Sequence, residues 1–215
     1  MEIYQLPKST LVNRNIPKNA FDEYANSKQK KDFTNYISKI TWKHKISQET
    51  VNLHGDDIKE IQLFEIQLKE KQTISGLLDL IDKSIPYHII FIITIGEELF
   101  FRTAKKHPHP TNPDNSIIDW VFSSNWINKS QCDFSLHLKV SVDSIYQDFC
   151  SLISDNHKKF ETIANMIEYQ SRVKELTSLI EKLESKIKKS KQFNKKIEMN
   201  IELNDLKSQL NLLLN

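Results

Sequence analysis

Glycine is the residue that this sequence most clearly lacks. Only three glycines occur among 215 residues, whereas globular proteins contain about 7% glycine. None of the three stands in a GxGxxG or GxxxxGK[ST] arrangement, in which glycines let the backbone approach a phosphate. The sequence therefore excludes the commonest nucleotide-binding loops, and we expect no cofactor.

Cysteines and long apolar runs are also scarce. Cys132 and Cys150 are the only cysteines, and their spacing does not suit a CxxC metal site, so we expect two unpaired thiols. The longest apolar run, Ile89–Ile95, is far shorter than the roughly 20 residues that a membrane-spanning helix needs. Residues 1–8 show no charged stretch followed by an apolar core, as a signal peptide would. These absences predict a cytoplasmic protein that does not enter a membrane.

A large excess of one charge is missing too. The 30 Lys and Arg residues nearly balance the 28 Asp and Glu residues, which leaves a formal net charge of +2. An obvious nucleic-acid-binding domain is much more basic than this. Hydrophobic residues make up 39% of the chain, which is enough for a core, and the length suits one ordinary domain with an appendage.

The composition changes near residue 154. Residues 1–153 contain all six prolines and all three tryptophans, whereas residues 155–215 contain no Pro, Gly or Trp and are rich in Lys, Glu, Leu, Ile, Asn and Ser. We therefore predict two domains, residues 1–153 and residues 155–215.

The first domain mixes strand-like and helix-like segments. Alternating or β-branched apolar residues predict strands at residues 40–46, 61–69, 88–94, 99–103, 117–126 and 134–140. Apolar residues at helical spacing predict helices at residues 30–38, 74–85 and 142–153, and Pro17 predicts a short helix through Tyr24. Residues 107–115, with three prolines, suggest an irregular loop. This order predicts an α+β fold on a mixed, largely antiparallel sheet.

The second domain carries the strongest periodic signal. Apolar residues at alternating steps of three and four form two seams: Val173, Leu176, Ile180, Leu183 and Ile187 in the first, and Leu203, Leu206, Leu210 and Leu213 in the second. The seams are out of register, and a Lys-rich segment at residues 188–196 separates them. The pattern predicts either a helical hairpin or one long coiled-coil helix with a change of phase. Both need a partner surface, so we expect association with another protein or with a second copy.

One set of residues suggests a metal-dependent nuclease. In one broad class of these enzymes, a strand with Glu/Gln-x-Lys follows an upstream Asp; the carboxylates hold Mg²⁺ or Mn²⁺, and the Lys supports the attacking water. Asp57 precedes Glu65, Gln67 and Lys69, and the last three share one face of a predicted strand. The solvated face of an edge strand gives the same pattern.

Another set of residues suggests weak nucleic-acid binding. Many lysines fall within the first 45 positions, among them Lys8, Lys18, Lys43 and Lys45, and Trp42 lies beside the last two. Lysines next to an aromatic ring suit phosphate contacts beside a stacking surface. A solvated surface with Trp42 packed in the core is the alternative interpretation.

Several motifs together resemble one protein family. They are Leu6-Pro7-Lys8-Ser9-Thr10, Ile16-Pro17-Lys18, residues 40–47, residues 60–66, Ile85-Pro86-Tyr87-His88 and residues 191–206. Taken in order, they look like the bacterial and archaeal domain-of-unknown-function family DUF4391. The resemblance implies a small cytosolic protein that is often encoded near helicases and DNA methyltransferases, in clusters like those of restriction and antiphage defence. It implies no activity and no catalytic residues.

These observations order the functional hypotheses. The first is a non-enzymatic accessory protein of a DNA-processing or antiphage-defence assembly, which associates through its C-terminal helices. The second is a metal-dependent nuclease of such a system, and the third is a direct DNA-binding module.

Overall fold

The structure is a computed structural model that describes residues 6–132, 134–154 and 158–214. Contacts within the chain divide it into two units at Lys159 and Phe160, and each unit is described by itself. The predicted boundary at residues 154–155 borders residues 155–157, which lie outside the described residues.

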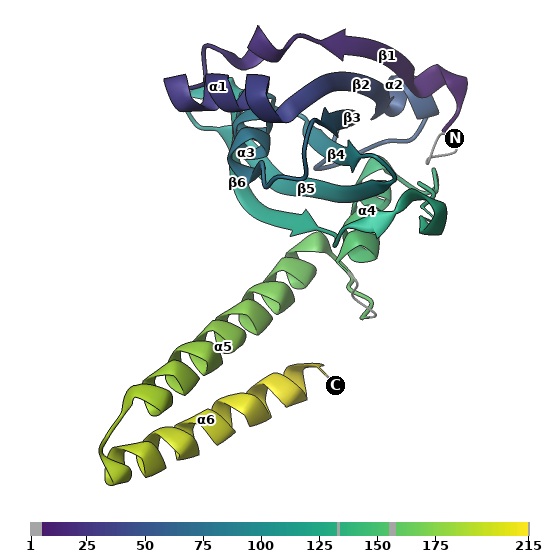
Figure 1. The fold of residues 1–215 in the computed structure, drawn as a ribbon. Coiled ribbons are helices and arrows are strands. Elements are labelled where there is room, and N and C mark those ends of the chain that lie inside the picture. The colour runs from purple at the N-terminus through teal and green to yellow at the C-terminus, as the bar shows by residue number, and fades with distance from the viewer. Residues whose placement is uncertain (1–5, 133, 155–157, 215) are drawn as a thin grey trace. The chain divides into compact units, whose positions relative to one another are not determined.

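The first unit is built on one mixed sheet with the strand order β1-β2-β3-β4-β5-β6, shown in Figure 1. The strands are β1 (Leu11–Ile16), β2 (Ile37–Ser47), β3 (Glu60–Leu68), β4 (His88–Ile95), β5 (Glu98–His109), β6 (Asn112–Ser123) and β7 (Ile127–Asn128), which pairs with the start of β5. Strands β3 and β4 are parallel, whereas the other described pairs are antiparallel. The predicted α+β fold with a mixed, largely antiparallel sheet is confirmed.

Helices cover both faces of this sheet. The helices of the first unit are α1 (Ser27–Tyr36), the one-turn α2 (Gln48–Val51), α3 (Ser75–Ser84) and α4 (Val142–Ile153), with 3₁₀ turns η1 (Lys8–Thr10), η2 (Lys18–Phe21) and η3 (Lys129–Gln131). Phe33 of α1 and Leu78 of α3 belong to one buried cluster with Phe64 and Phe91 of the sheet. On the other face, Phe149 of α4 packs edge-on against Phe101 of β5, with ring centroids 6.0 Å apart. Helix α3 is also the crossover that the parallel pair β3–β4 requires.

Three predictions about local structure are wrong. Residues 107–115 are not an irregular loop, because β5 runs to His109 and β6 begins at Asn112. Pro108 is tolerated there because β5 pairs with β4 only up to Thr103 and has β6 alone beyond it. Residues 134–140 form no strand in the described part, although Phe134 is buried. The helix after Pro17 is a single 3₁₀ turn that ends at Phe21.

A carboxylate fixes the loop that leads into β3. Asp143, in the first turn of α4, accepts the backbone N–H groups of Asp56, Asp57 and Ile58 at 2.6, 3.0 and 2.8 Å. Gly55 allows this tight path, because a Cβ at that position would lie 2.0 Å from the carbonyl oxygen of Ile58. The loop and α4 are therefore held together although they are far apart in the sequence.

The second unit is a hairpin of two helices, α5 (Ile163–Lys189) and α6 (Phe193–Leu214). Its core consists of Ile180, Leu183 and Leu203, with Ile187, Met199, Leu206 and Leu210 packed around them. An ion pair of 2.8 Å between Lys207 and Glu184 joins the two helices. Of the two arrangements that the seams predicted, the hairpin is the one found. Leu176 is also buried, whereas Val173 and Leu213 are half-buried.

No helix of the described residues is both long enough and apolar enough to span a membrane. No disulfide joins Cys132 and Cys150.

Candidate functional site

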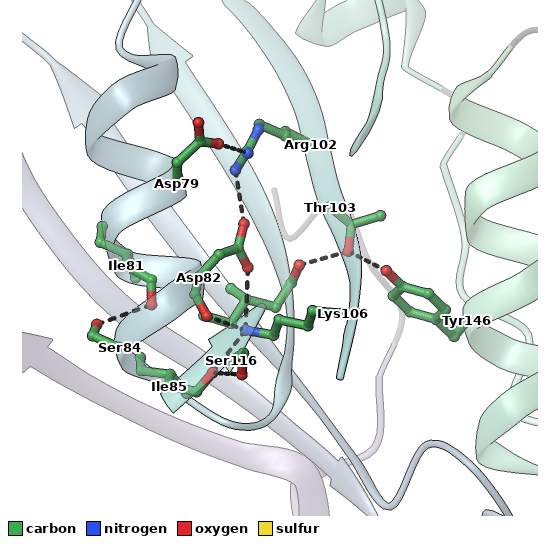
Figure 2. A network of polar contacts seen from close by, with 11 residues as sticks. Asp79, Ile81, Asp82, Ser84, Ile85, Arg102, Thr103, Lys106, Ser116 and Tyr146 are labelled. Carbon is green, nitrogen blue, oxygen red and sulfur yellow. Dashed lines mark hydrogen bonds and ion pairs between the residues drawn. The ribbon is translucent and has the colours of Figure 1, made fainter. Parts of the chain in front are cut away.

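Buried charges join α3 to β5 in the network that Figure 2 shows. The side chains of Asp82 and Lys106 are 0% exposed and that of Arg102 is 4% exposed. Arg102 donates from Nη1 to Asp82 Oδ2 at 2.8 Å and from Nη2 to Asp79. Lys106 donates from Nζ to the main-chain oxygens of Asp82 and Ile85 at 2.7 and 2.8 Å, and its Nζ lies 3.3 Å from Asp82 Oδ1.

Local structure brings these four charged side chains together. Asp79 and Asp82 are three residues apart on α3 and therefore lie on one face of the helix. Arg102 and Lys106 are four residues apart on β5, so both point to the same side of the sheet. Because α3 packs on that side, two carboxylates meet two cations, and their formal charges cancel.

Burial changes the acidity of this network without making it reactive. Burial raises the pKa of Asp82, although Lys106 and Arg102 oppose this effect. Burial also lowers the pKa of Lys106 to about 8, against the attraction of Asp82. All three N–H groups of the Lys106 ammonium have an acceptor, so the group is held as a cation. The network therefore fixes α3 on the sheet and offers no free base.

Two cavities flank α3. The first, here called the Trp126 cavity, has a volume of about 330 Å³ and is lined by Lys71, Gln72, Thr73, Ile74, Ser75, Leu78, Phe100, Arg102, Val121, Ser123 and Trp126. The second, the Asp79 cavity, has a volume of about 530 Å³ and is lined by Tyr24, Gln29, Gly76, Asp79, Leu80, Lys83, Ser84, His109, Asn115 and Ser116. Both volumes fall in the range of sites for one small ligand.

The opposite face of the sheet buries a neutral histidine. His88, at the start of β4, is 7% exposed, and its ring packs edge-on against Tyr146 with centroids 4.8 Å apart. Its Nε2 atom has no hydrogen-bond partner among the described residues. Burial lowers the pKa of His88 to about 3, and the nearby cations Lys105 and Lys106 contribute to the shift. This ring is a packed core group.

Helix α6 presents a site of a different kind, an apolar stripe that α5 does not cover. Phe193, Ile197, Ile201 and Leu212 are 75%, 46%, 67% and 80% exposed. At about 100° per residue, Ile197, Ile201 and Leu212 lie within about 60° of one another. They lie on the side opposite to Leu203, Leu206 and Leu210, which face α5. Helix α6 is therefore apolar on two opposite sides.

The structure does not gather the four residues of the nuclease hypothesis. Gln67 donates to Glu65 at 3.1 Å, and Lys69 Nζ donates to the main-chain oxygen of Thr34 at 2.7 Å. Asp57 precedes one end of β3 and Lys69 follows the other, and the nine residues of the strand span roughly 25 Å at about 3.3 Å each.

The neighbours of Glu65 and Gln67 supply no second acid. Their partners across the sheet are Thr41 and Lys39 on β2 and Ile92 and Thr94 on β4. Within the described ranges, no three His, Cys, Asp or Glu side chains are placed to hold a metal ion. These pairings also make β3 an interior strand and not an edge strand.

Trp42, the aromatic residue beside the basic residues of the N-terminal region, is half-buried and packs against the core. The Trp42 ring packs against Phe64, with centroids 6.3 Å apart, and its Nε1 donates to the main-chain oxygen of His44. Lys45 pairs with Glu49 and Glu60 at 3.1 and 3.0 Å. Lys8 is exposed, whereas Lys18 and Lys43 are half-exposed. Nucleic-acid binding by this region stays a prediction.

Sequence reasoning did not single out the network of Asp82, Arg102 and Lys106. A signal was present, because Asp82 adjoins Ile81 in a helix whose other inward residues are apolar. Likewise, Arg102 and Lys106 flank the buried Ala104 on one face of a strand. Charges at apolar positions of two neighbouring elements indicate a buried ion network.

Comparison with known proteins identifies a family and no activity. Residues 5–210 match the model of a family described as Domain of unknown function (DUF4391). No curated protein and no solved structure matches the chain.

Proposed function

Because the chain belongs to the DUF4391 family, whose description assigns no activity, we propose a function from its own geometry. The protein is a non-enzymatic assembly protein, and its α5–α6 hairpin pairs with the hairpin of a second copy. The observation that carries this proposal is the second apolar stripe of α6, formed by Phe193, Ile197, Ile201 and Leu212.

The hairpin has only a small core, and this supports the proposal that further helices pack on it. Ile180, Leu183 and Leu203 are buried in it, each at 7–8% exposure. A unit of this size buries a small share of its apolar surface on folding, and helices gain most of their stability by packing an apolar face. A helix that is apolar on two sides is typically an interior helix.

A second copy suits the stripe because its centre carries no charge. Between Ile201 and Leu212, Asn204 and Ser208 lie on the same side of α6, and Asp205 lies at the border of the stripe, where it accepts a hydrogen bond from Gln209 at 2.8 Å. Two identical stripes can therefore meet along their centres while Asp205 stays at the solvent-exposed border, so that no unpaired ion is buried. A twofold axis between two hairpins gives a four-helix bundle, and twofold symmetry is the commonest in homo-oligomers.

The mass of the full chain in solution tests this proposal. Light scattering behind size exclusion, at about 10–100 μM protein, should give twice the chain mass of 25.3 kDa. Ile201→Glu should give the monomer mass with unchanged helix content, because Ile201 is 67% exposed and outside the α5 seam. Ser185→Glu, which adds the same charge on the outer side of α5, should remain a dimer.

Two outcomes would overturn the proposal. One is a wild-type chain that is monomeric up to about 100 μM; the stripe would then require a different protein as its partner. The other is a dimer that Ile201→Glu leaves intact, which would place the interface elsewhere.

We further propose that this dimer serves a DNA-processing or antiphage-defence assembly. The family resemblance supports this part, since it implies genes near helicases and DNA methyltransferases. Copurification with the proteins encoded beside it, followed by mass spectrometry, should recover a helicase or a methyltransferase with the wild-type chain. Recovery of neither protein would contradict the assignment.

A further inference from the structure

The lining of the Trp126 cavity is cationic. Lys71 and Arg102 line it, and none of its lining residues is acidic. The acids that pair with these cations stand outside the lining: Asp79 and Asp82 bind Arg102, and Glu98 binds Lys71. The lining itself thus offers two cationic side chains and no carboxylate, and an anion that replaces Glu98 on Lys71 forms an ion pair there.

The side chain of Arg102 is held in a fixed position at the wall of this cavity. The residue is 3% exposed, and Asp79 and Asp82 hold its guanidinium from the α3 side, as Figure 2 shows. Of the five N–H donors that a guanidinium carries, these two contacts use two. An arginine held in this way binds an oxyanion with little loss of side-chain freedom.

Two aromatic side chains line the cavity next to its cationic residues. The rings of Phe100 and Trp126 meet edge-to-face, with centroids 4.6 Å apart. Lys71 Nζ lies 4.9 Å from the centre of the Trp126 ring, and it binds both carboxylate oxygens of Glu98 at 2.7 and 2.8 Å. Lys71 is 48% exposed at its side chain, so it can exchange Glu98 for a ligand anion. The indole then offers a flat surface to a ring beside that anion.

The position in the fold agrees with this chemistry. The cavity includes residues 71–75, which connect the carboxyl end of β3 to the first turn of α3. In α/β crossovers, ligands bind at the carboxyl ends of parallel strands. The N-cap residue of α3 is Ile74, whose side chain makes no capping hydrogen bond, and the partial positive charge at the start of a helix also favours an anion.

The geometry points to the Trp126 cavity as the binding site of a small anion attached to a flat aromatic ring, as in a nucleoside monophosphate. Arg102 and Lys71 bind the phosphate, and Trp126 stacks on the base. This site lies wholly within the first unit and is independent of the proposed dimer. It also differs from the glycine-rich phosphate loops that the sequence excludes.

Calorimetric titration of the full chain with adenosine 5′-monophosphate tests the site. We expect saturable binding, with adenosine alone and inorganic phosphate alone each at least about 10-fold weaker. Lys71→Met should raise the Kd for the nucleotide at least about 10-fold. Glu98→Gln should lower the Kd several-fold, because it releases Lys71 from its carboxylate.

Lys83→Met is the matched control. Lys83 is an exposed lysine of α3 that lines the other cavity, so its removal should leave the Kd unchanged. Absence of binding at about 2 mM nucleotide, in both the wild type and Glu98→Gln, would overturn the inference. Equal losses in Lys71→Met and Lys83→Met would also overturn it, since the effect would then be one of general charge. Phosphate that binds as tightly as the nucleotide would refute the stacking part.

Discussion

Lys106 of β5 binds Asp82 of α3 twice, once at the carboxylate and once at the main-chain oxygen. The last carbonyl groups of a helix lack partners within the helix, and α3 ends two residues after Asp82, at Ser84. A lysine from a strand thus completes the end of a helix, and its positive charge also suits the negative end of the helix dipole. The sheet and the helix that covers it depend on each other through this contact.

Removal of Lys106 should therefore be costly. Lys106→Met leaves the buried Asp82 carboxylate with Arg102 alone and removes the donor to two main-chain oxygens. We expect a loss of about 3–5 kcal/mol in the free energy of unfolding, as for other broken buried ion pairs. Urea denaturation followed by circular dichroism measures it. Lys105→Met, one residue earlier and on the other face of β5, should cost about 0.5 kcal/mol or less, and equal losses in the two variants would contradict this account.

His88 should make the protein less stable in acid. Its pKa is about 3 in the folded chain, against 6.5 for the free side chain, so between these values the unfolded state binds a proton that the folded state does not. Stability should consequently fall as the pH decreases from about 6.5 to about 3, by up to about 1.4 kcal/mol per pH unit from this group. Above pH 6.5 the histidine should have no effect.

His88→Phe isolates this contribution from that of the carboxylates. The variant keeps an aromatic ring against Tyr146 and removes the titrating group. At pH 4.5 it should be more stable than the wild type by about 2.5 kcal/mol relative to their difference at pH 7. If the difference between the two proteins does not change with pH, His88 is not buried as a neutral ring.

The carboxylate of Asp143 should contribute more to the stability of the protein than its position in a surface helix suggests. Asp143→Ala removes the acceptor of three backbone N–H groups, at Asp56, Asp57 and Ile58. We expect a loss of roughly 2–4 kcal/mol in the free energy of unfolding, since hydrogen bonds to a charged group contribute more than neutral ones. Chemical denaturation gives the value. Asp148→Ala, at an exposed position of the same helix, should have little effect.

Two glycines should respond in opposite directions to the same substitution. Gly55→Ala places a Cβ 2.0 Å from the carbonyl oxygen of Ile58 and should destabilise the protein by more than about 2 kcal/mol, because the backbone must move. Gly76→Ala meets nothing within 4 Å and lies in the first turn of α3, so it should stabilise the protein by up to about 1 kcal/mol. Thermal melts of the two variants should shift to opposite sides of the wild type.

Helices and strands with a periodic apolar pattern could be predicted from the sequence, whereas the side-chain contacts between distant elements could not. The seams of α5 and α6 and the β-branched run of β4 follow from local spacing, because one face of each element must be buried. The contact between Asp82 and Lys106 depends on how α3 lies across β5, and no local pattern encodes that placement. The Trp126 cavity could not be predicted from the sequence for the same reason, since Lys71, Arg102 and Trp126 come from separate segments.

The errors at residues 107–115 and 134–140 have a related cause. Pro108 signals a break only where a strand has neighbours on both sides, and β5 has lost one neighbour by that point. Phe134 and Leu136 alternate as in a strand, but the Phe134 ring is buried against Phe101 and Phe149, with centroids 4.6 and 5.5 Å apart, and the segment pairs with no strand among the described residues. In both cases the local pattern predicted the wrong structure, because contacts with residues distant in the sequence decided it.

The contact of Asp143 with residues 56–58 has a consequence for synthesis. A ribosome that adds about 5–20 residues per second needs roughly 4–17 s to make the 87 residues that separate Asp56 from Asp143. Throughout that interval, the turn before β3 lacks the carboxylate that accepts its three amide groups in the folded protein. A chain that ends before residue 143 should therefore hold this turn less firmly than the full chain does.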